Sequence, residues 1–296
     1  MIVATSLEEF DRWRLSDAPC VLVPTMGALH EGHASIIRQG AALAAKHPGG
    51  ACVVTIFVNP TQFNDPADFA RYPKTFDADV ALCEAAGAGV VLAPPVNEVY
   101  PPDHAPRVPP LPRVATAPGL EDRFRPGHFA GVCQVVARLF DLTRPVEAVF
   151  GEKDWQQLRV VAAMAERTHP AVRIVPGETV REPDGLAMSS RNRFLSPAER
   201  QRAAGVSRAL RESLRAPTAQ EAETTMRGVL AEVGADVEYA VVRDALTLEP
   251  GGPEPSTPGA APAMRALIAA RFGATRLIDN ALWTPGAGGV PLARHP

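Results

Sequence analysis

Short apolar runs alternate with helical patterns up to about residue 180 of this 296-residue chain. The apolar runs fall at residues 21–24, 53–58, 90–93, 148–150 and 172–175. The helical patterns occupy 34–46, 75–87, 128–142 and 154–167. Strands that alternate with helices pair in parallel, and continuous apolar strands are those buried on both faces. The pattern therefore predicts an α/β fold with a Rossmann-like parallel sheet and helices on both faces.

The pattern changes after residue 179. Two helical stretches rich in Ala, Arg and Glu, at 197–214 and 218–233, precede strand-like runs. Those runs lie at 236–243, 264–271 and 275–279. We therefore expect two domains, a Rossmann-like domain of residues 1–179 and a smaller C-terminal α+β domain of residues 180–296. The low-complexity stretch Pro250–Pro262 is expected to be a surface loop of the second domain.

Charge and cysteine usage exclude several classes of function. The net charge is −3 and no long basic run occurs, which is a poor electrostatic basis for binding nucleic acid or an anionic membrane. The four cysteines lie far apart and form no C-x-x-C pair, so neither a disulfide framework nor a cysteine metal site is predicted. No apolar run approaches membrane-spanning length and no signal peptide is evident, so we expect a cytoplasmic protein.

Two histidines follow the first apolar run in the sequence PTMGALHEGH, residues 24–33. Because His30 and His33 are three residues apart at a predicted helix start, they share one face of its first turn. The unpaired backbone N–H groups and the positive end of the helix dipole make that place an anion site. The pattern indicates a polyphosphate ligand, with imidazole N–H donors aimed at charge that develops on oxygen. A metal pair or two ordinary surface histidines are the alternatives.

Two polar segments lie beside other predicted elements of the sheet. VNPTQF, residues 58–63, follows the second strand, and its amides suit hydroxyl groups and a carboxylate. An Asn-Pro turn is the plainer interpretation. RPGHF, residues 125–129, precedes the third helix; Arg125 is suited to a phosphate or carboxylate, and His128 to a helix cap or a core position.

Two more polar segments carry positive charge. GEKDWQQL, residues 151–158, runs from a strand into a helix, with Lys153 as a point charge for phosphates and Asp154 in the position of an N-cap. MSSRN, residues 188–192, could close on phosphates from the second domain. For residues 151–158, the alternative is an ordinary solvent-exposed turn of charged residues. All four segments and the histidine turn are expected at one rim of the sheet.

These five motifs, in this order and spacing, resemble the pantothenate synthetase (pantoate–β-alanine ligase) family of the H-x-G-H nucleotidyltransferase superfamily. The resemblance extends to TRLIDN, residues 275–280. It implies condensation of pantoate with β-alanine to pantothenate, AMP and pyrophosphate through a pantoyl adenylate. ATP is implied as a substrate, Mg²⁺ as a cofactor and a homodimer as the assembly.

The resemblance also implies roles for individual residues. The catalytic residues would be His30, His33 and Lys153. ATP would contact Met26, His33, Gly151, Lys153, Asp154, Val180, Met188, Ser189, Ser190 and Arg191. Pantoate would contact Met26, Gln62 and Gln157, and the β-alanine or gate region would hold Asn59, Gln62, Tyr72 and Arg125. No side chain is implied as a metal ligand, and the C-terminal domain would act as a lid.

Three positions depart from the family pattern: Trp155 stands where Tyr or Phe is usual, Phe194 where Tyr is usual and Lys74 where Arg is usual. The stretch Pro250–Pro262 matches nothing in the family. Three alternatives remain open at this point. They are a nucleotidyltransferase that joins a nucleotide to a phosphate-bearing acceptor, an aminoacyl-tRNA synthetase fragment, and a non-catalytic nucleotide-binding protein. The Gln62 and Gln157 amides favour a hydroxy acid over a second phosphate.

Overall fold

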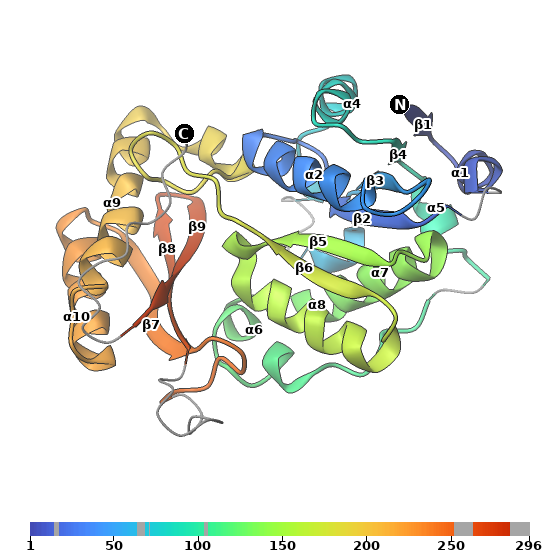
Figure 1. The fold of residues 1–296 in the computed structure, drawn as a ribbon. Coiled ribbons are helices and arrows are strands. Elements are labelled where there is room, and N and C mark those ends of the chain that lie inside the picture. The colour runs from blue at the N-terminus through green and yellow to red at the C-terminus, as the bar shows by residue number, and fades with distance from the viewer. Residues whose placement is uncertain (15–17, 64–68, 71, 104–105, 252–262, 285–296) are drawn as a thin grey trace. The chain divides into compact units, whose positions relative to one another are not determined.

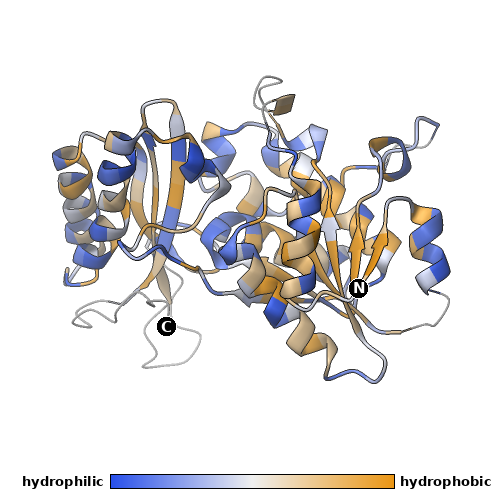
Figure 2. Ribbon diagram, turned by 90° about the horizontal axis from the view of Figure 1, so that it is seen from above, coloured by the Kyte–Doolittle hydropathy of each residue, from blue (hydrophilic) through white to orange (hydrophobic). Residues whose placement is uncertain are grey.

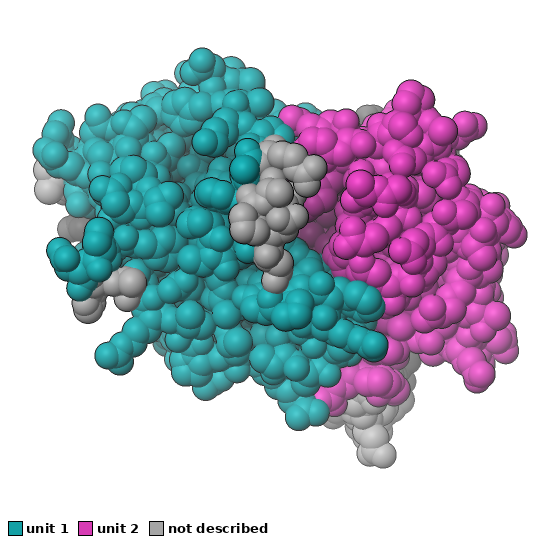
Figure 3. Space-filling model, turned by 180° about the vertical axis from the view of Figure 1, so that it is seen from behind, with its two compact units in different colours: residues 1–152, 156–178 teal, residues 153–155, 179–296 magenta. Residues whose placement is uncertain are grey.

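A computed structural model describes the chain except residues 15–17, 64–68, 71, 104–105, 252–262 and 285–296. The predicted loop Pro250–Pro262 thus lies almost entirely outside the described residues. The chain forms two compact units, which are coloured separately in Figure 3. Unit 1 comprises residues 1–152 and 156–178, and unit 2 comprises residues 153–155 and 179–296.

Unit 1 is built on a six-stranded parallel sheet, which confirms the predicted fold class (Figure 1). The strands are β1 (Ile2–Ala4), β2 (Cys20–Thr25), β3 (Ala51–Ile56), β4 (Val90–Leu92), β5 (Glu147–Gly151) and β6 (Arg173–Gly177). Their order is β1-β4-β3-β2-β5-β6. The sequence pattern did not indicate β1, an edge strand in which two of the three residues are exposed, whereas β4, equally short, is completely buried and forms an apolar run.

Helices cover both faces of this sheet, with α2 and α4 on one face and α7 and α8 on the other (Figure 1). The longer helices are α1 (Leu7–Arg14), α2 (Glu31–Ala44), α4 (Phe76–Ala85), α7 (His128–Thr143) and α8 (Trp155–Thr168). The short ones are η1 (Pro60–Gln62), α5 (Val96–Val99), η2 (Arg113–Ala115), α6 (Glu121–Phe124) and η3 (Glu152–Asp154). The apolar strands form the orange centre of this unit in Figure 2.

Helix α2 lies unusually close to the sheet. A Cβ placed on Gly40 would come within 2.8 Å of Val23 Cγ2 and 3.0 Å of Cys52 Sγ. Ile37 of the same helix is completely buried among strand residues of the same core cluster. Close packing along this face fixes the direction of α2, and with it the position of its N-terminus.

The strand order reverses direction between β2 and β5. From β2 the chain proceeds outward through β3 to β4, whereas from β5 it proceeds the other way to β6. In open parallel sheets, ligands bind beyond the carboxyl ends of the strands at such a reversal. Here those ends are Thr25 of β2 and Gly151 of β5.

Unit 2 is an antiparallel three-stranded sheet with two long helices, and it confirms the predicted smaller α+β part of the fold. The strands are β7 (Asp236–Asp244), β8 (Met264–Phe272) and β9 (Thr275–Trp283), in the order β7-β8-β9. Helices α9 (Pro197–Ser213) and α10 (Ala219–Glu232) share a core with one sheet face that includes Leu210, Met226 and Ile268. The short helix η4 (Ser190–Phe194) precedes them.

A helix that crosses a membrane must be both long and apolar. None of the described helices meets these two requirements.

Candidate active site

The turn that leads to the histidines is held by a buried carboxylate. Gly27 and Ala28 both have positive φ, at 81° and 52°. Asp79 of α4, which is 3% exposed, accepts hydrogen bonds from the backbone N–H groups of Ala28 (3.0 Å) and Leu29 (2.8 Å). Asp79 was not predicted from the sequence, where the available signal was a carboxylate near Val80 and Cys83 on the apolar side of a helix.

His30 and His33 form a reciprocal cap at the start of α2. The Gly32 N–H donates to Nδ1 of His30 (3.1 Å), and the His30 N–H donates to Nδ1 of His33 (3.3 Å). His30 is the N-cap residue, with extended backbone at φ −142°. The two rings lie with their centroids 4.1 Å apart. The cap therefore places both imidazoles at the N-terminus of α2.

This cap fixes the tautomer of each ring. A neutral imidazole has one donor nitrogen and one acceptor nitrogen. Since Nδ1 of each ring accepts from a backbone N–H, the ring proton is on Nε2 in both His30 and His33. The pair thus presents two N–H donors beside the positive end of the α2 dipole, an arrangement suited to stabilising a phosphate.

Gln62 is the centre of a buried amide network. Its Nε2 donates to Met26 Sδ (2.7 Å), and its Oε1 accepts from Asn59 Nδ2 (3.2 Å). Asn59 is 1% exposed, and its second amide hydrogen goes to the Gly131 carbonyl (3.1 Å). The Asn59 oxygen accepts from Tyr100 Oη (2.8 Å). Burial raises the pKa of Tyr100, which keeps this phenol protonated.

The predicted residues Met26, Asn59 and Gln62 are therefore brought together by the structure. Both amide hydrogens of Asn59 are engaged inside the protein, so its observed part is to orient Gln62. Tyr72 belongs to the same neighbourhood, because its hydroxyl donates to the Gly27 carbonyl (3.3 Å) and its ring meets the edge of Phe63.

His128 connects this network to Arg125. The buried imidazole contacts the Gln62 carbonyl through Nδ1 (3.0 Å) and Arg125 Nη1 through Nε2 (3.0 Å). A carbonyl can only accept and a guanidinium can only donate, so Nδ1 carries the proton of His128. Of the alternatives for His128, the buried core position is the one observed. Arg125 also lies 3.9 Å from the carboxylate of Glu121.

Two glutamines that are adjacent in sequence have different surroundings. Gln156 is buried, where its Oε1 accepts from the Glu121 N–H (2.9 Å) and its Nε2 donates to the Val114 carbonyl (3.0 Å). Gln157, the predicted pantoate ligand, is half-buried. Gly151 ends β5, and a Cβ there would meet no described atom within 4 Å other than those of its chain neighbours.

Five of the predicted ATP-contacting residues of unit 2, from Val180 to Arg191, lie on one hairpin-like segment and the short helix that follows it. The Met188 N–H donates to the Val180 carbonyl (2.9 Å), next to an antiparallel bridge between Arg181 and Ala187. Ser189 caps η4 by accepting from the Arg191 N–H (3.3 Å). Ser190 and Arg191 are half-buried.

Lys153 and its neighbours also belong to unit 2. The Lys153 ammonium lies 3.2 Å from Asp154 Oδ1. Trp155, one of the departures from the family pattern, donates from its indole N–H to the Ala245 carbonyl (2.8 Å), a bond that Phe could not make. The N-cap role expected of Asp154 stays a prediction, as do the ligand contacts of all these residues.

The four thiols are buried, and the described acidic groups do not form a metal cage. Burial raises the pKa of Cys20, Cys52, Cys83 and Cys133 to about 12, so these thiols are protonated and unreactive at neutral pH. Among the described residues, no group of three His, Cys, Asp or Glu side chains could hold a metal ion.

Comparison with known proteins gives one consistent result. The family model described as pantoate-beta-alanine ligase matches residues 3–282. A pantothenate synthetase of Bradyrhizobium sp. is 47% identical over 276 residues, covering 92% of this chain and 93% of its own. One from Rubrobacter xylanophilus is 45% identical over 284 residues, covering 91% and 93%.

Solved structures agree with this result. The pantothenate synthetase of Thermus thermophilus has a TM-score of 0.84 at 37% identity, covering 95% of this chain and 99% of its own. The pantoate-beta-alanine ligase of Francisella tularensis, solved with "Beta-gamma ATP and Beta-alanine", has a TM-score of 0.75 at 30% identity, covering 95% and 97%.

Proposed function

The chain belongs to the pantoate-beta-alanine ligase family, and from that premise we propose how its residues carry out the family's reaction. The enzyme condenses pantoate with β-alanine, using ATP and releasing AMP and pyrophosphate. A pantoate carboxylate oxygen attacks the α-phosphorus of ATP, and the bond to the β-phosphate breaks. The β-alanine amine then attacks the acyl carbon of pantoyl adenylate, and AMP leaves. Family membership removes the three alternative functions considered for the sequence.

The His30 and His33 pair is the observation that supports the catalytic assignment most directly. As pyrophosphate departs, negative charge grows on the oxygens of the breaking bond. Two Nε2–H donors held rigidly by the α2 cap can stabilise that charge without reorganising. Lys153 supplies a full positive charge to the same phosphates. We assign Met26, Gly151, Asp154, Val180, Met188, Ser189, Ser190 and Arg191 to ATP binding with them.

Pantoate is assigned to the amide network of unit 1. The buried Gln62, oriented by Asn59 and packed against Met26, would bind the hydroxy acid together with Gln157. Neutral amides can hold hydroxyl groups and a carboxylate while leaving the carboxylate nucleophilic. Arg125, Asn59 and Tyr72 border this site and are assigned to the β-alanine or gate region.

Mg²⁺ is assigned to the ATP phosphates. This ion prefers phosphate oxygens and retained waters, so it needs no cage of protein side chains. We also propose that residues 180–296, which make up most of unit 2, serve as a lid domain and residues 1–179 as the other functional domain, and that the enzyme is a cytoplasmic homodimer. Sedimentation velocity of the purified protein would measure the assembly state.

Pyrophosphate–ATP isotope exchange tests the proposed mechanism. Exchange should require pantoate and Mg²⁺ and should proceed in the absence of β-alanine, because adenylation precedes amine attack. The Lys153→Ala variant should lose exchange and still convert supplied pantoyl adenylate and β-alanine to pantothenate. Exchange that requires β-alanine would contradict the two-step order. Normal exchange by Lys153→Ala would contradict the assignment of Lys153.

A further inference from the structure

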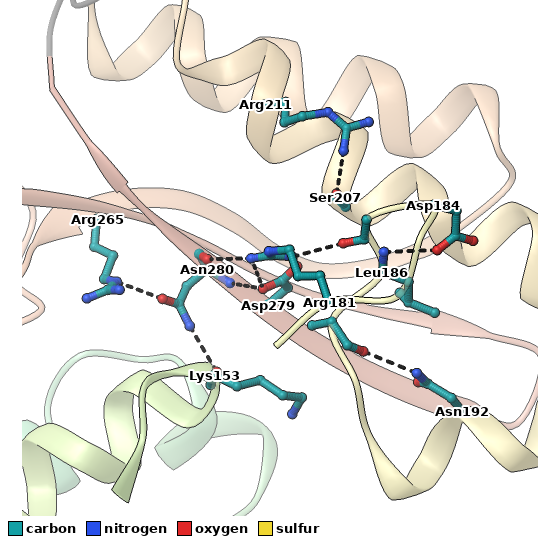
Figure 4. Close-up of polar contacts among 12 residues, drawn as sticks. Lys153, Arg181, Asp184, Leu186, Asn192, Ser207, Arg211, Arg265, Asp279 and Asn280 are labelled. Carbon is teal, nitrogen blue, oxygen red and sulfur yellow. Dashed lines mark hydrogen bonds and ion pairs between the residues drawn. The ribbon is translucent and has the colours of Figure 1, made fainter. Parts of the chain in front are cut away.

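The consecutive residues Asp279 and Asn280 of β9 lie at the centre of a buried polar network in unit 2 (Figure 4). They are 2% and 4% exposed, unusual for an acid and an amide in a strand whose neighbours Leu277 and Ala281 belong to an apolar core. Burying such groups costs free energy unless they are bonded, so their partners define what they do.

Asn280 holds the main chain of Lys153. Its Nδ2 donates to the Lys153 carbonyl at 2.9 Å, between residues that are 127 positions apart in the sequence. Its Oδ1 accepts from Arg265 Nε at 2.6 Å. The Arg265 guanidinium in turn lies 3.3 Å from the centroid of the Trp155 ring. Asn280 therefore contacts Lys153 directly and Trp155 through Arg265.

Asp279 holds the other predicted ATP-contacting segment. Its carboxylate forms a two-pronged ion pair with Arg181, at 2.6 Å to Nη1 and 3.0 Å to Nη2. Arg181 also donates to the Gly185 carbonyl (3.1 Å), which closes the segment that carries Val180 and Met188. The pair is almost completely buried, so a bond of this geometry fixes the segment firmly.

We propose that Asp279 and Asn280 are positioning residues for adenylation. Asn280 sets the place of Lys153, Asp279 sets the place of the Val180–Ser190 segment, and their adjacency on β9 keeps the two in fixed register within unit 2. The inference rests on the proposed role of Lys153. A positioning role explains why β9 contains two buried polar residues, although no contact with substrate is assigned to this strand.

The test separates the two half-reactions. Asn280→Asp keeps an acceptor for Arg265 and replaces the amide that donates to the Lys153 carbonyl. Small displacements of a positioned group can cost about 10²-fold in rate. We expect pantoate-dependent pyrophosphate–ATP exchange to lose about 10- to 100-fold in kcat. Conversion of supplied pantoyl adenylate and β-alanine should stay within about twofold, since the phosphates that Lys153 neutralises have already left.

Arg276→Gln is the matched control, because Arg276 lies on the same strand and its Nε pairs with Glu238 Oε2 at 2.7 Å. It should lower the melting temperature without changing the ratio of the two half-reactions. Equal loss of both half-reactions by Asn280→Asp, or unchanged exchange, would overturn the proposal. Lys153→Ala, measured in parallel, distinguishes the failures: if it retains exchange, the proposed role of Lys153 itself is wrong.

Discussion

Each histidine of the H-x-G-H sequence has two ring nitrogens with different tasks. Nδ1 of His30 and of His33 completes the helix cap, which assigns the proton to Nε2. A side chain at this place must therefore accept at one end and donate at the other. Ser or Asp could cap the helix but could not present an N–H to a phosphate.

Replacing either histidine with Ala should lower kcat for pantoate-dependent exchange by about 10²- to 10³-fold, the usual effect of removing one such donor. ATP affinity should change much less, because the donors act mainly on charge that develops as pyrophosphate leaves. Loss of the cap should also cost about 1 kcal/mol of folding stability. Isotope-exchange rates and thermal melting measure the two effects.

Ser196→Ala is the control for this prediction. Ser196 caps α9 in a reciprocal box with Glu199, so the variant loses a cap without touching the proposed site. Its exchange rate should equal that of the wild type. Near-normal turnover by both histidine variants would remove them from catalysis.

The glutamines give a second prediction at this scale. Gln62→Ala or Gln157→Ala should raise KM for pantoate by the equivalent of about 1–3 kcal/mol, because a bound carboxylate or hydroxyl loses its partner. ATP affinity measured without pantoate should stay unchanged. Gln156→Ala should instead destabilise the fold, since that amide satisfies buried backbone groups. An equal loss of ATP affinity in the Gln62 variant would place its amide in the nucleotide site.

Gly151 gives a third prediction at the residue scale. Apart from its chain neighbours, no described atom lies within 4 Å of a Cβ at this position, and Gly151 is not among the glycines with positive φ, so packing among the described residues does not require glycine. If the nucleotide approaches the end of β5 closely, Gly151→Ala should raise KM for ATP while the melting temperature holds. Unchanged ATP kinetics would show that the open space is not used by the ligand.

At the scale of elements, η1 and α7 are packed backbone to backbone. A Cβ on Gly131 would lie 2.4 Å from the Thr61 carbonyl oxygen and 2.8 Å from the Gln62 nitrogen. The Gly131 carbonyl also accepts from Asn59. Helix α7 thus sets the position of the η1 backbone that carries Gln62. Only glycine at position 131 permits the two backbones to come this close.

Gly131→Ala should push η1 away, lower the melting temperature and raise KM for pantoate together. Gly228→Ala is its control, because Gly228 is also inside a helix, α10, and a Cβ there meets nothing within 4 Å. That change should stabilise the protein by about 0.5–1 kcal/mol and leave pantoate binding alone. Normal pantoate kinetics in Gly131→Ala would show that the loop tolerates displacement.

The elements were largely predictable from sequence, and the contacts between them were not. Apolar runs indicated β2 to β6, and helical spacing indicated α2, α4, α7 and α8, because burial of a strand or of one helix face leaves that pattern in the sequence. Strand β1 was missed because it lies at the edge of the sheet with two of its three residues exposed. Asp79 was missed because its partners, the N–H groups of Ala28 and Leu29, lie about 50 positions away, so no local pattern reveals them. The link from Asn280 to Lys153 escaped for the same reason.

At the scale of the whole molecule, all four cysteines belong to unit 1 and all are buried. Their pKa values of about 12 lie above the ordinary value of 9.0, so ionisation favours the unfolded chain. The contribution of the protonated thiols to folding stability is therefore complete below pH 9 and is lost as pH rises from there toward 12. We expect the native thiols to resist Ellman's reagent at about pH 8 and all four to react in denaturant. Rapid reaction of any native thiol would contradict the burial.

The chain enters unit 2 twice, first for Lys153–Trp155 and again from Thr179 onward. A single cut therefore cannot separate the two units without dividing one of them. In a chimera between two relatives, a C-terminal part exchanged at residue 179 would bring its own counterparts of Ala245, Arg265 and Asn280 against a foreign Lys153–Trp155. Exchange of that tripeptide together with the C-terminal part would preserve the match. Recombination between relatives should therefore favour parents in which residues 153–155 and the β7–β9 sheet carry matched substitutions.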